Sequence, residues 1–199
     1  MNPFQSENEF DGRRFKQITL EDDRLSDKAF YDCSFSDCSF RETAFRDCTF
    51  DGCLFKNCDL SLITVEGCSF NNTRFEHSKV IGVDWTYAFW PGFVLQPPLS
   101  FLACAVDYST FIGLKLPKIS FKDSSLKDVA FTEADLTGAD FSGSDLSKST
   151  FHQTKLQGAN FAGAAGYHID LTQNDAAKAK FSLPEAMSLL YALNIEITE

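Results

Sequence analysis

The chain has 199 residues, of which 44% are hydrophobic and 23% charged, so it can bury a core and is not expected to be disordered. Its formal net charge of −10 disfavours nucleic acid and anionic membranes as direct partners, but it permits a partner protein with a basic surface. The first ten residues do not resemble a signal peptide, and no run of 18 apolar residues predicts a membrane span. We therefore expect a cytoplasmic protein with reduced cysteines.

From the N-terminus onward, an apolar residue recurs at every fifth position. The register runs from Phe10 to Trp90, slips by one residue, and resumes from Phe101 to Phe161. All 30 of these positions are apolar, and they hold 17 of the 21 phenylalanines. A period of five fits neither an α-helix nor a continuous strand. It predicts a chain that turns a corner after each pentapeptide, so that four segments close a square coil and successive coils stack at about 4.8 Å.

A second column, two residues before the first, holds small side chains. Each pentapeptide therefore supplies one large and one small inward residue. We interpret the cysteines as small buried hydrophobes with free thiols, because CxxC spacing is absent and residues 20 positions apart should stack one coil above another. All seven cysteines fall in this column: Cys33, Cys38, Cys48, Cys53, Cys58, Cys68 and Cys104.

The regular array is expected to span residues 26–180. Arg13, Asp23 and Lys28 occupy small inward positions, where an unpaired charge would be costly, so residues 1–25 are predicted to form an irregular cap and first coil. A register break near residues 90–100 contains three prolines, which cannot donate to a stacked ladder, and one extra residue must bulge out. The break is either a tolerated kink or a contact loop. The candidate contact residues are Trp90, Pro91, Phe93, Pro97 and Pro98.

Residues 181–199 change character. Ser182 to Glu185 fits a helix capping box, apolar residues follow at helical spacing, and the last residues alternate like a strand. This helix and strand are either a lid on the solenoid end or half of a dimer interface. The candidate interface residues are Leu189, Leu190, Leu193, Ile195 and Ile197.

The pentapeptides at 134–138 (ADLTG) and 139–143 (ADFSG) resemble the pentapeptide-repeat family, whose motif is small, polar, Leu or Phe, polar, polar. The resemblance covers roughly residues 10–170 and implies an all-β solenoid, namely a right-handed quadrilateral parallel β-helix. The tail Leu-Leu-x-x-Leu-x-Ile-x-Ile, with the blocks at 58–63, 151–156 and 181–186, is similar to the topoisomerase-protecting branch that includes Qnr, MfpA and the microcin B17 immunity protein. Within that branch the chain is most similar to the albicidin-resistance type, AlbG.

This resemblance implies a DNA-mimicking homodimer that pairs through its C-terminal module. The implied partner is DNA gyrase, with topoisomerase IV as a second candidate, and the implied role is resistance or self-immunity to a topoisomerase poison. It implies no cofactor. The alternative is a structural or scaffold solenoid with an unrelated protein partner.

The charge pattern gives a test that does not depend on the family. Allowing for a one-residue slip, one face passes through Phe10, Phe50, Trp90, Phe111 and Phe151, and its outward positions carry acids and no Lys or Arg. Such a face could mimic part of a DNA duplex, or it could merely keep a solenoid soluble. The acidic candidates are Glu9, Asp11, Asp32, Asp51, Glu133 and Asp170.

We find no pattern for an enzyme. The three histidines make no metal-ligand spacing, and aspartate recurs as a scaffold residue beside the apolar column instead of as a convergent pair. No glycine-rich phosphate loop is present in the sequence. We therefore expect neither a catalytic nor a metal site.

Overall fold

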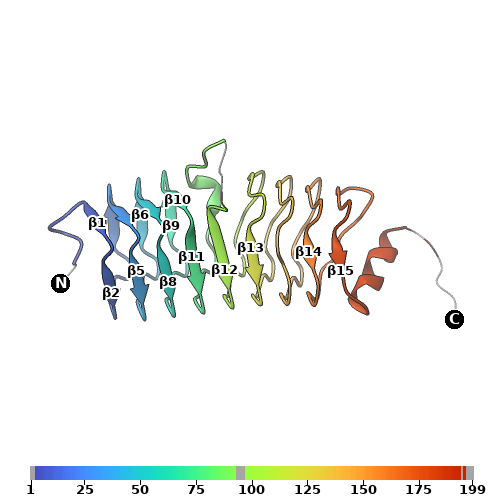
Figure 1. The fold of residues 1–199 in the computed structure, drawn as a ribbon, viewed down its shortest axis with the longest axis horizontal. Helices are drawn as coiled ribbons and strands as arrows, with labels where there is room; N and C mark the ends of the chain where they lie inside the picture. Colours follow the sequence, from blue (N-terminus) through green and yellow to red (C-terminus); the bar gives the residue numbers. More distant parts are fainter. Residues whose placement is uncertain (1–2, 93–96, 194, 196–199) are drawn as a thin grey trace.

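The computed structural model describes residues 3–92, 97–193 and 195. The chain winds into a rod of stacked coils with its two ends at opposite ends of the rod (Figure 1). This is the predicted right-handed quadrilateral parallel β-helix. Every strand pair is parallel and joins residues of adjacent coils, as between Phe35 and Phe55 or between Phe45 and Val65.

Each coil has four sides, which we call faces 1 to 4 in the order that the chain follows them. In the first coil they are centred on Phe10, Phe15, Leu20 and Leu25. Face 3 has isolated bridges only, beginning with that between Thr19 and Ser39. On face 1 the strands are β1 (Glu9–Asp11), β4 (Ala29–Tyr31), β7 (Thr49–Asp51) and β10 (Ser69–Asn71). On face 4 they are β3 (Arg24–Ser26), β6 (Ala44–Arg46) and β9 (Thr64–Glu66).

Face 2 carries the longest sheet, and it continues along the whole rod. Its six-stranded part lies on both sides of the register break, and a two-stranded part follows near the C-terminus. The strands are β2 (Arg14–Lys16), β5 (Ser34–Ser36), β8 (Leu54–Lys56), β11 (Thr73–Glu76), β12 (Leu99–Leu102), β13 (Ser120–Lys122), β14 (Asn160–Phe161) and β15 (Lys180–Phe181).

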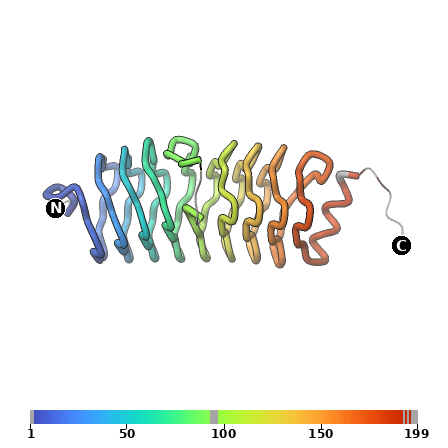
Figure 2. The backbone as a smooth tube through the Cα atoms, turned by 45° about the horizontal axis from the view of Figure 1, so that its top comes forward, coloured from blue at the N-terminus to red at the C-terminus, as the bar shows by residue number. Residues whose placement is uncertain are grey.

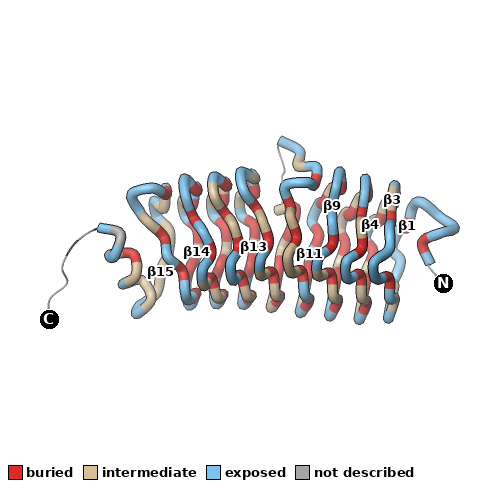
Figure 3. The backbone as a smooth tube through the Cα atoms, turned by 180° about the vertical axis from the view of Figure 1, so that it is seen from behind, coloured by how far each residue is buried: buried red, intermediate tan, exposed pale blue. Residues whose placement is uncertain are grey.

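The core runs along the rod axis (Figure 3). The predicted large column is buried throughout, except that Phe15 and Trp90 are half-buried. Aromatic rings stack from coil to coil; the centroids of Phe35 and Phe55, for example, are 4.5 Å apart with an interplanar angle of 6°. The stacked rings and the parallel ladders stabilise the same register, so packing and hydrogen bonding specify one coil geometry.

The small column is buried from Cys33 to Ala164, except that Leu114 is half-buried, and all seven cysteines are free thiols. The Cys53 Sγ lies 3.3 Å from the Phe30 carbonyl oxygen in the coil below, and the Thr73 hydroxyl donates to the Phe50 carbonyl in the same way. Burial raises the pKa of Cys53 to about 12 and that of Cys104 to about 11. These two thiols therefore act as small packing groups and weak donors.

Regular coiling begins earlier than the sequence predicted, because β1 already pairs in register with β4. The charges of the first coils turn away from the core: Arg13 forms an ion pair with Glu7, and the Lys28 ammonium donates to the Glu7 carbonyl. The end of the rod is closed by Phe4, which is 1% exposed and lies outside the five-residue register. Its ring packs edge-on against Phe10, Phe15 and Phe30.

The register break is larger than predicted. Phe75 pairs with Phe101, 26 positions later, whereas Phe55 and Phe75 are 20 positions apart. The coil therefore carries six extra residues, and not one. They follow η1, a 3₁₀-helix over Trp85–Tyr87, and the green segment around η1 protrudes from the rod (Figures 1 and 2).

The C-terminal end is closed by η2, a nine-residue 3₁₀-helix over Glu185–Leu193. The predicted helix is therefore present, but the side chains of the expected capping box bond to the last coil. Ser182 Oγ accepts from the Gly163 N–H, and Glu185 Oε1 accepts from the Gly166 N–H at 2.7 Å. These two bonds satisfy backbone donors at the open end of the ladder.

Candidate partner-binding surface

The larger insertion reassigns the faces of the second half of the rod. Thr110 bridges to Asp84, so Phe111 continues face 4 above Trp85, and does not lie above Trp90 as the sequence had predicted. Of the predicted acidic residues, Glu9, Asp11, Asp32 and Asp51 lie on face 1, whereas Glu133 and Asp170 lie on face 4. The six residues therefore do not form a single acidic face.

Face 4 is the most acidic side of the rod once the register is corrected. It has seven carboxylates against two arginines, a net charge of −5, and beyond Glu66 its described residues include no Lys or Arg. Asp27, Asp47 and Glu133 are exposed at its corners. The carboxylates are Asp23, Asp27, Asp47, Glu66, Asp84, Glu133 and Asp170, and the arginines are Arg24 and Arg46.

The opposite side, face 2, is basic. It carries seven cationic side chains against four carboxylates, a net charge of +3. Arg14, Lys16 and Lys56 are exposed on it. Because faces 2 and 4 are opposite sides of a square coil, the rod is polarised across its width. A partner with a basic surface is attracted to one side and repelled by the other.

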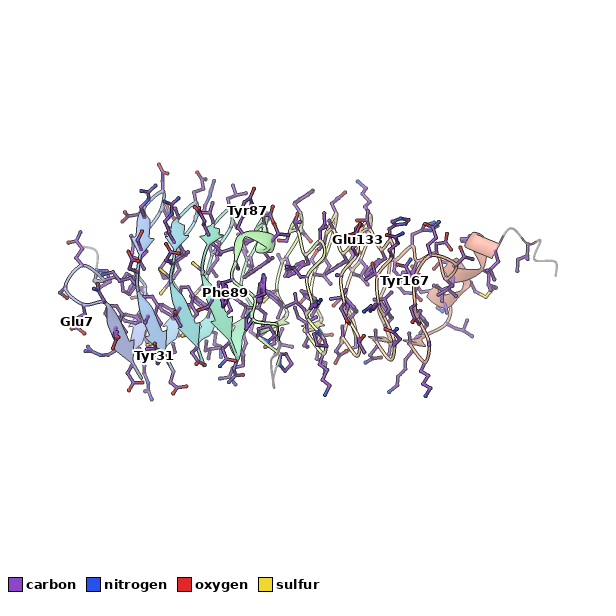
Figure 4. All side chains as sticks on the ribbon, turned by 90° about the horizontal axis from the view of Figure 1, so that it is seen from above. Glu7, Tyr31, Tyr87, Phe89, Glu133 and Tyr167 are labelled. Carbon is purple, nitrogen blue, oxygen red and sulfur yellow. The ribbon has the colours of Figure 1, made fainter. Side chains whose placement is uncertain are left out.

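The acidic side chains of face 4 are held in different ways. Asp84 is the N-cap of η1 and accepts from the N–H and hydroxyl of Thr86. Asp170 accepts from the same two groups of Thr172, and these hydrogen bonds lower the pKa of Asp170. Glu133 projects from a corner of the same side of the rod as Tyr87, whereas Tyr31 points away from the other side (Figure 4). Face 4 thus presents both fixed and freely exposed negative charge.

A groove of about 380 Å³ opens on face 4 beside η1. Apolar and aromatic side chains form most of its wall, and two carboxylates lie among them. Tyr87 is 66% exposed at its rim. Sequence reasoning missed this groove, because it arises from a break in the ladder and not from a motif. The lining residues are Leu62, Ile63, Thr64, Val65, Glu66, Gly82, Asp84 and Tyr87.

The predicted contact loop is only partly available to a partner. Trp90 is half-buried, stacks on Phe70, and donates from Nε1 to the Trp85 carbonyl at 2.9 Å. Pro98 is buried and Pro97 half-buried, whereas Pro91 is exposed. Phe93 lies outside the described residues. Phe89, which was not among the predicted contact residues, has an exposed ring (61% exposure).

Some of the predicted dimer residues are buried within the chain, and others are exposed. Leu189 is 7% exposed because it packs on the end of the solenoid within the same chain, so it serves the lid and is not free for a partner. Leu190 is half-buried, Leu193 and Ile195 are exposed, and Ile197 lies outside the described residues. Three further exposed apolar residues, Leu183, Met187 and Tyr191, lie on or beside η2 and were not predicted.

The sequence profile of the pentapeptide repeat region matches residues 28–96 and 94–161, which together make up more than half of the chain. The chain belongs to the pentapeptide-repeat family. No curated protein matches this pentapeptide-repeat protein in sequence.

Solved structures share its fold at low sequence identity. A trypsin-treated form of QnrB1, a plasmid-mediated fluoroquinolone resistance protein, is 18% identical with a TM-score of 0.74, over 96% of this chain and 99% of that one. HetL, a pentapeptide-repeat protein involved in heterocyst differentiation regulation from the cyanobacterium Nostoc sp. strain PCC 7120, is 16% identical with a TM-score of 0.61, over 87% of each chain. These likenesses establish the fold.

The described part of the pentapeptide-repeat protein contains no group of three or more His, Cys, Asp or Glu placed to hold a metal ion. Across those same residues, no helix has the length and apolar character needed to cross a membrane. The chemistry that its surface offers is charge, exposed aromatic rings and a groove, all of which suit binding.

Proposed function

We propose that this protein binds a type II topoisomerase, DNA gyrase or else topoisomerase IV, through acidic face 4, and thereby confers resistance or self-immunity to a topoisomerase poison. The observation that carries the proposal is the polarised rod: its carboxylates gather on face 4 and its cations on the opposite face 2. An enzyme that holds DNA presents basic surface to it, so an acidic rod gains association rate and orientation there.

The mimicry of DNA is partial in this proposal. Duplex DNA carries one charge per about 1.7 Å, a density well above that of a net −5 spread along a rod of about 40 Å. The rod therefore competes with DNA by its shape and its one-sided charge. The fold similarity to QnrB1, itself a fluoroquinolone resistance protein, supports the same class of role.

A second candidate function is that of a regulatory scaffold with an unrelated protein partner. HetL, which has the same fold, is involved in heterocyst differentiation regulation, so the solenoid alone does not select gyrase. Both functions use a protein-binding surface and need no catalytic group.

The functional unit in this proposal is a homodimer that pairs through η2 and the residues after it. Exposed apolar side chains on this helix, such as Leu193 and Tyr191, are the surface that a second copy would cover. A dimer joined at this end would be a rod of twice the length.

The test is charge reversal on the two opposite faces. Replacing Asp27, Asp47 and Glu133 by Lys reverses three charges on face 4, and the fold should tolerate lysine there because Lys118 and Lys148 occupy equivalent corners at φ near +60°. Inhibition of gyrase supercoiling and capture of gyrase by the protein should both fall roughly tenfold or more, and wild-type binding should weaken as salt rises.

The matched control replaces Arg14, Lys16 and Lys56 on face 2 by Glu and should leave inhibition intact. Loss of activity in the face 2 variant with retention in the face 4 variant would contradict the electrostatic proposal. Failure of the wild-type protein to capture either topoisomerase would favour the scaffold.

A further inference from the structure

The hydrogen-bond ladder of face 4 is interrupted between β9 and the coil above it. The sheet that contains β3, β6 and β9 ends at β9, and bridging on this face resumes only between Asp84 and Thr110. Two backbone bonds bracket the gap: Leu62 N–H to the Ile81 carbonyl at 2.8 Å, and Gly67 N–H to the Tyr87 carbonyl at 3.0 Å.

The gap coincides with a local shift of one residue in the upper coil, and the chain is back in the ordinary register at Phe89, which pairs with Ser69. The offset of the first bracketing bond would join Gly67 to residue 86, but the bond is made to Tyr87. The shift falls in the 3₁₀ turn η1, where the chain leaves the ladder above β9. The groove of about 380 Å³ lies in the space between the two coils.

The gap leaves buried backbone groups without their ladder partners. Ile63 is 4% exposed and Val65 is 1% exposed, and both line the groove. On face 3, the Leu60 N–H bonds to the Lys79 carbonyl of the coil above. Among the described residues, the equivalent Val65 N–H of face 4 has no such bond, and the Ile63 carbonyl likewise accepts none from the coil above. Unpaired buried backbone groups are rare in proteins and indicate a place where something else binds.

The wall of the groove also offers free carboxylate oxygens. Arg46 donates to Glu66 Oε2, and Thr86 donates to Asp84 Oδ1, so the structure records no partner for Glu66 Oε1 or Asp84 Oδ2. Together with the Ile63 carbonyl, these are three hydrogen-bond acceptors beside the exposed ring of Tyr87. An acceptor-rich, negatively charged groove with an aromatic wall is complementary to a cation with several donors.

We propose that this groove binds an arginine side chain presented by an exposed segment of a partner protein. A planar guanidinium has five N–H donors and no acceptor, and it stacks on aromatic rings. Its aliphatic stem packs against Leu62 and Val65, its face lies on Tyr87, and its donors reach the free oxygens of Glu66 and Asp84. The size of the groove is in the range of sites that hold small groups.

This inference deepens the proposed function, because it identifies one anchoring point on a diffusely acidic face. It rests on the proposed function for the identity of the partner. Diffuse attraction would make all exposed carboxylates of face 4 equivalent. Anchoring makes the groove residues matter more than Glu133, which lies on the same face two coils away.

The first experiment uses the full chain, labelled with ¹⁵N, and N-acetyl-arginine methylamide as the probe, followed by NMR. Saturable shifts confined to residues 62–66 and 82–87 are expected, with the uncharged citrulline analogue binding at least about tenfold more weakly. Equal binding of citrulline, shifts spread over every acidic residue, or equal binding of the lysine analogue would overturn the assignment of arginine.

The second experiment fills the groove without changing its charge. Leu62→Trp should weaken the probe about tenfold or more, and Tyr87→Ala should do so by a few-fold, whereas Tyr31→Ala on face 1 should leave it unchanged. Circular dichroism and the unfolding midpoint of each variant show that the fold is retained. Unchanged probe binding by folded Leu62→Trp would refute the proposal.

The same variants separate this inference from the proposed function. If gyrase is captured and Leu62→Trp captures it as well as wild type does, the groove is not the anchor although the function stands. If the probe binds in the groove but neither topoisomerase is captured, the site stands and its partner is another protein. Glu66→Gln compared with Glu133→Gln gives the matched charge control, and equal losses of gyrase binding in the two would indicate diffuse attraction only.

Discussion

The coils before the insertion, residues 9–76, and those after it, residues 99–181, have the same period of five but differ in how many of their faces form strands. Before the insertion, strands of three or four residues form on three faces. After it, the described residues form strands on face 2 alone, with isolated bridges at Asp140 between β13 and β14, and the other faces are joined by isolated bridges. One repeat length therefore supports two patterns of local hydrogen bonding.

Both halves contain two types of corner, which differ in what occupies the small position of the coil above. At one corner of the first half, Ser78 Oγ accepts from the Cys58 N–H at 3.0 Å and lies within hydrogen-bond distance of the Phe55 and Glu76 carbonyl oxygens. The hydroxyl of one coil is thereby inserted between two backbone groups of the coil below. Those two groups belong to residues three positions apart, which could otherwise bond to each other. Ser124 and Ser149 accept in the same way from the N–H groups of Cys104 and Val129 in the second half.

Where alanine takes that position, as it often does in the second half, the corner closes on itself. Ala139 lies above Ile119, and the Ile119 N–H bonds directly to the Leu116 carbonyl at 3.2 Å. The comparison shows that the type of corner depends on a side chain 20 residues away. The rule has an exception, since Ala134 makes the direct bond to the Phe131 carbonyl although Thr154 lies above it.

The aromatic stacks differ as well. Before the insertion, phenylalanines stack on faces 1 and 2, as in the pairs Phe30–Phe50 and Phe35–Phe55. After it, they stack on the opposite faces 4 and 2. Trp85 joins the two arrangements: it is fully buried, edge-on to Phe70 and stacked with Phe111. The insertion thus marks a change of core packing as well as of chain path.

The largest effect is expected from removing this junction. Trp85→Ala should cost about 3–5 kcal/mol of unfolding free energy, since it leaves a cavity that faces both halves of the rod. It should also uncouple them, so that urea unfolding followed by circular dichroism shows two transitions in place of one. The half-buried Trp90 is the control, and Trp90→Ala should cost less. A single transition with an unchanged midpoint in Trp85→Ala would show that the halves are not joined through this ring.

A smaller loss is expected at the C-terminal end of the second half. Leu189→Ala should cost about 2–3 kcal/mol, because Leu189 is buried on the last coil. Leu193, which is exposed, is the control for stability: Leu193→Asp should change unfolding by less than about 0.5 kcal/mol but should convert the proposed dimer to a monomer in light scattering. A Leu193→Asp protein that remains dimeric would place the interface elsewhere.

Acid should weaken the second half of the rod through Asp135, Asp140 and Asp145. Partial burial disfavours their charged forms, but hydrogen bonds from Thr137, Ser142 and Ser147 and the nearby lysines outweigh it, so their pKa values are lowered. A carboxyl with a lowered folded pKa stabilises the fold above its unfolded pKa of about 3.9, and this stability is lost as pH falls through the folded value.

Variants sharpen this acid prediction. Asp140→Asn should flatten the dependence of the urea midpoint on pH below about 4. Glu133→Gln, which removes a carboxylate with no recorded side-chain partner, should leave that dependence unchanged. Equal pH dependence in wild type and Asp140→Asn would show that this hydrogen-bonded carboxylate does not contribute.

The smallest effect is expected at a single corner of the first half. Ser78→Ala removes the bridging hydroxyl, but the Cys58 N–H and the Phe55 carbonyl can then bond directly, so the loss should be only about 0.5–1 kcal/mol. Hydrogen exchange at the Cys58 amide should remain slow. A loss above about 2 kcal/mol, or rapid exchange there, would show that the two corner types do not interconvert in this way.

The C-terminal lid and the N-terminal plug show where sequence reasoning was incomplete. The helix of η2 was predicted from its spacing, but Leu189 was assigned to a dimer because nothing in the spacing shows which side of the helix meets the last coil. Phe4 was missed because it lies outside the repeat and closes the rod by packing edge-on against the first rings. Both are contacts at an end, where the periodic pattern stops.

The sequence by itself determined the inward columns, the alternation of large and small residues, and hence the four-sided coil, because these are local properties that repeat every five residues. Only the tertiary structure decided how many residues are inserted between the coil of Phe75 and the coil of Phe101. Insertions of one and of six residues restore the same five-residue register. They differ by one pentapeptide, however, so every later pentapeptide lies on a different face of the rod in the two cases. The face on which Glu133 and Asp170 lie, and the groove beside η1, therefore depend on which coil stacks on which.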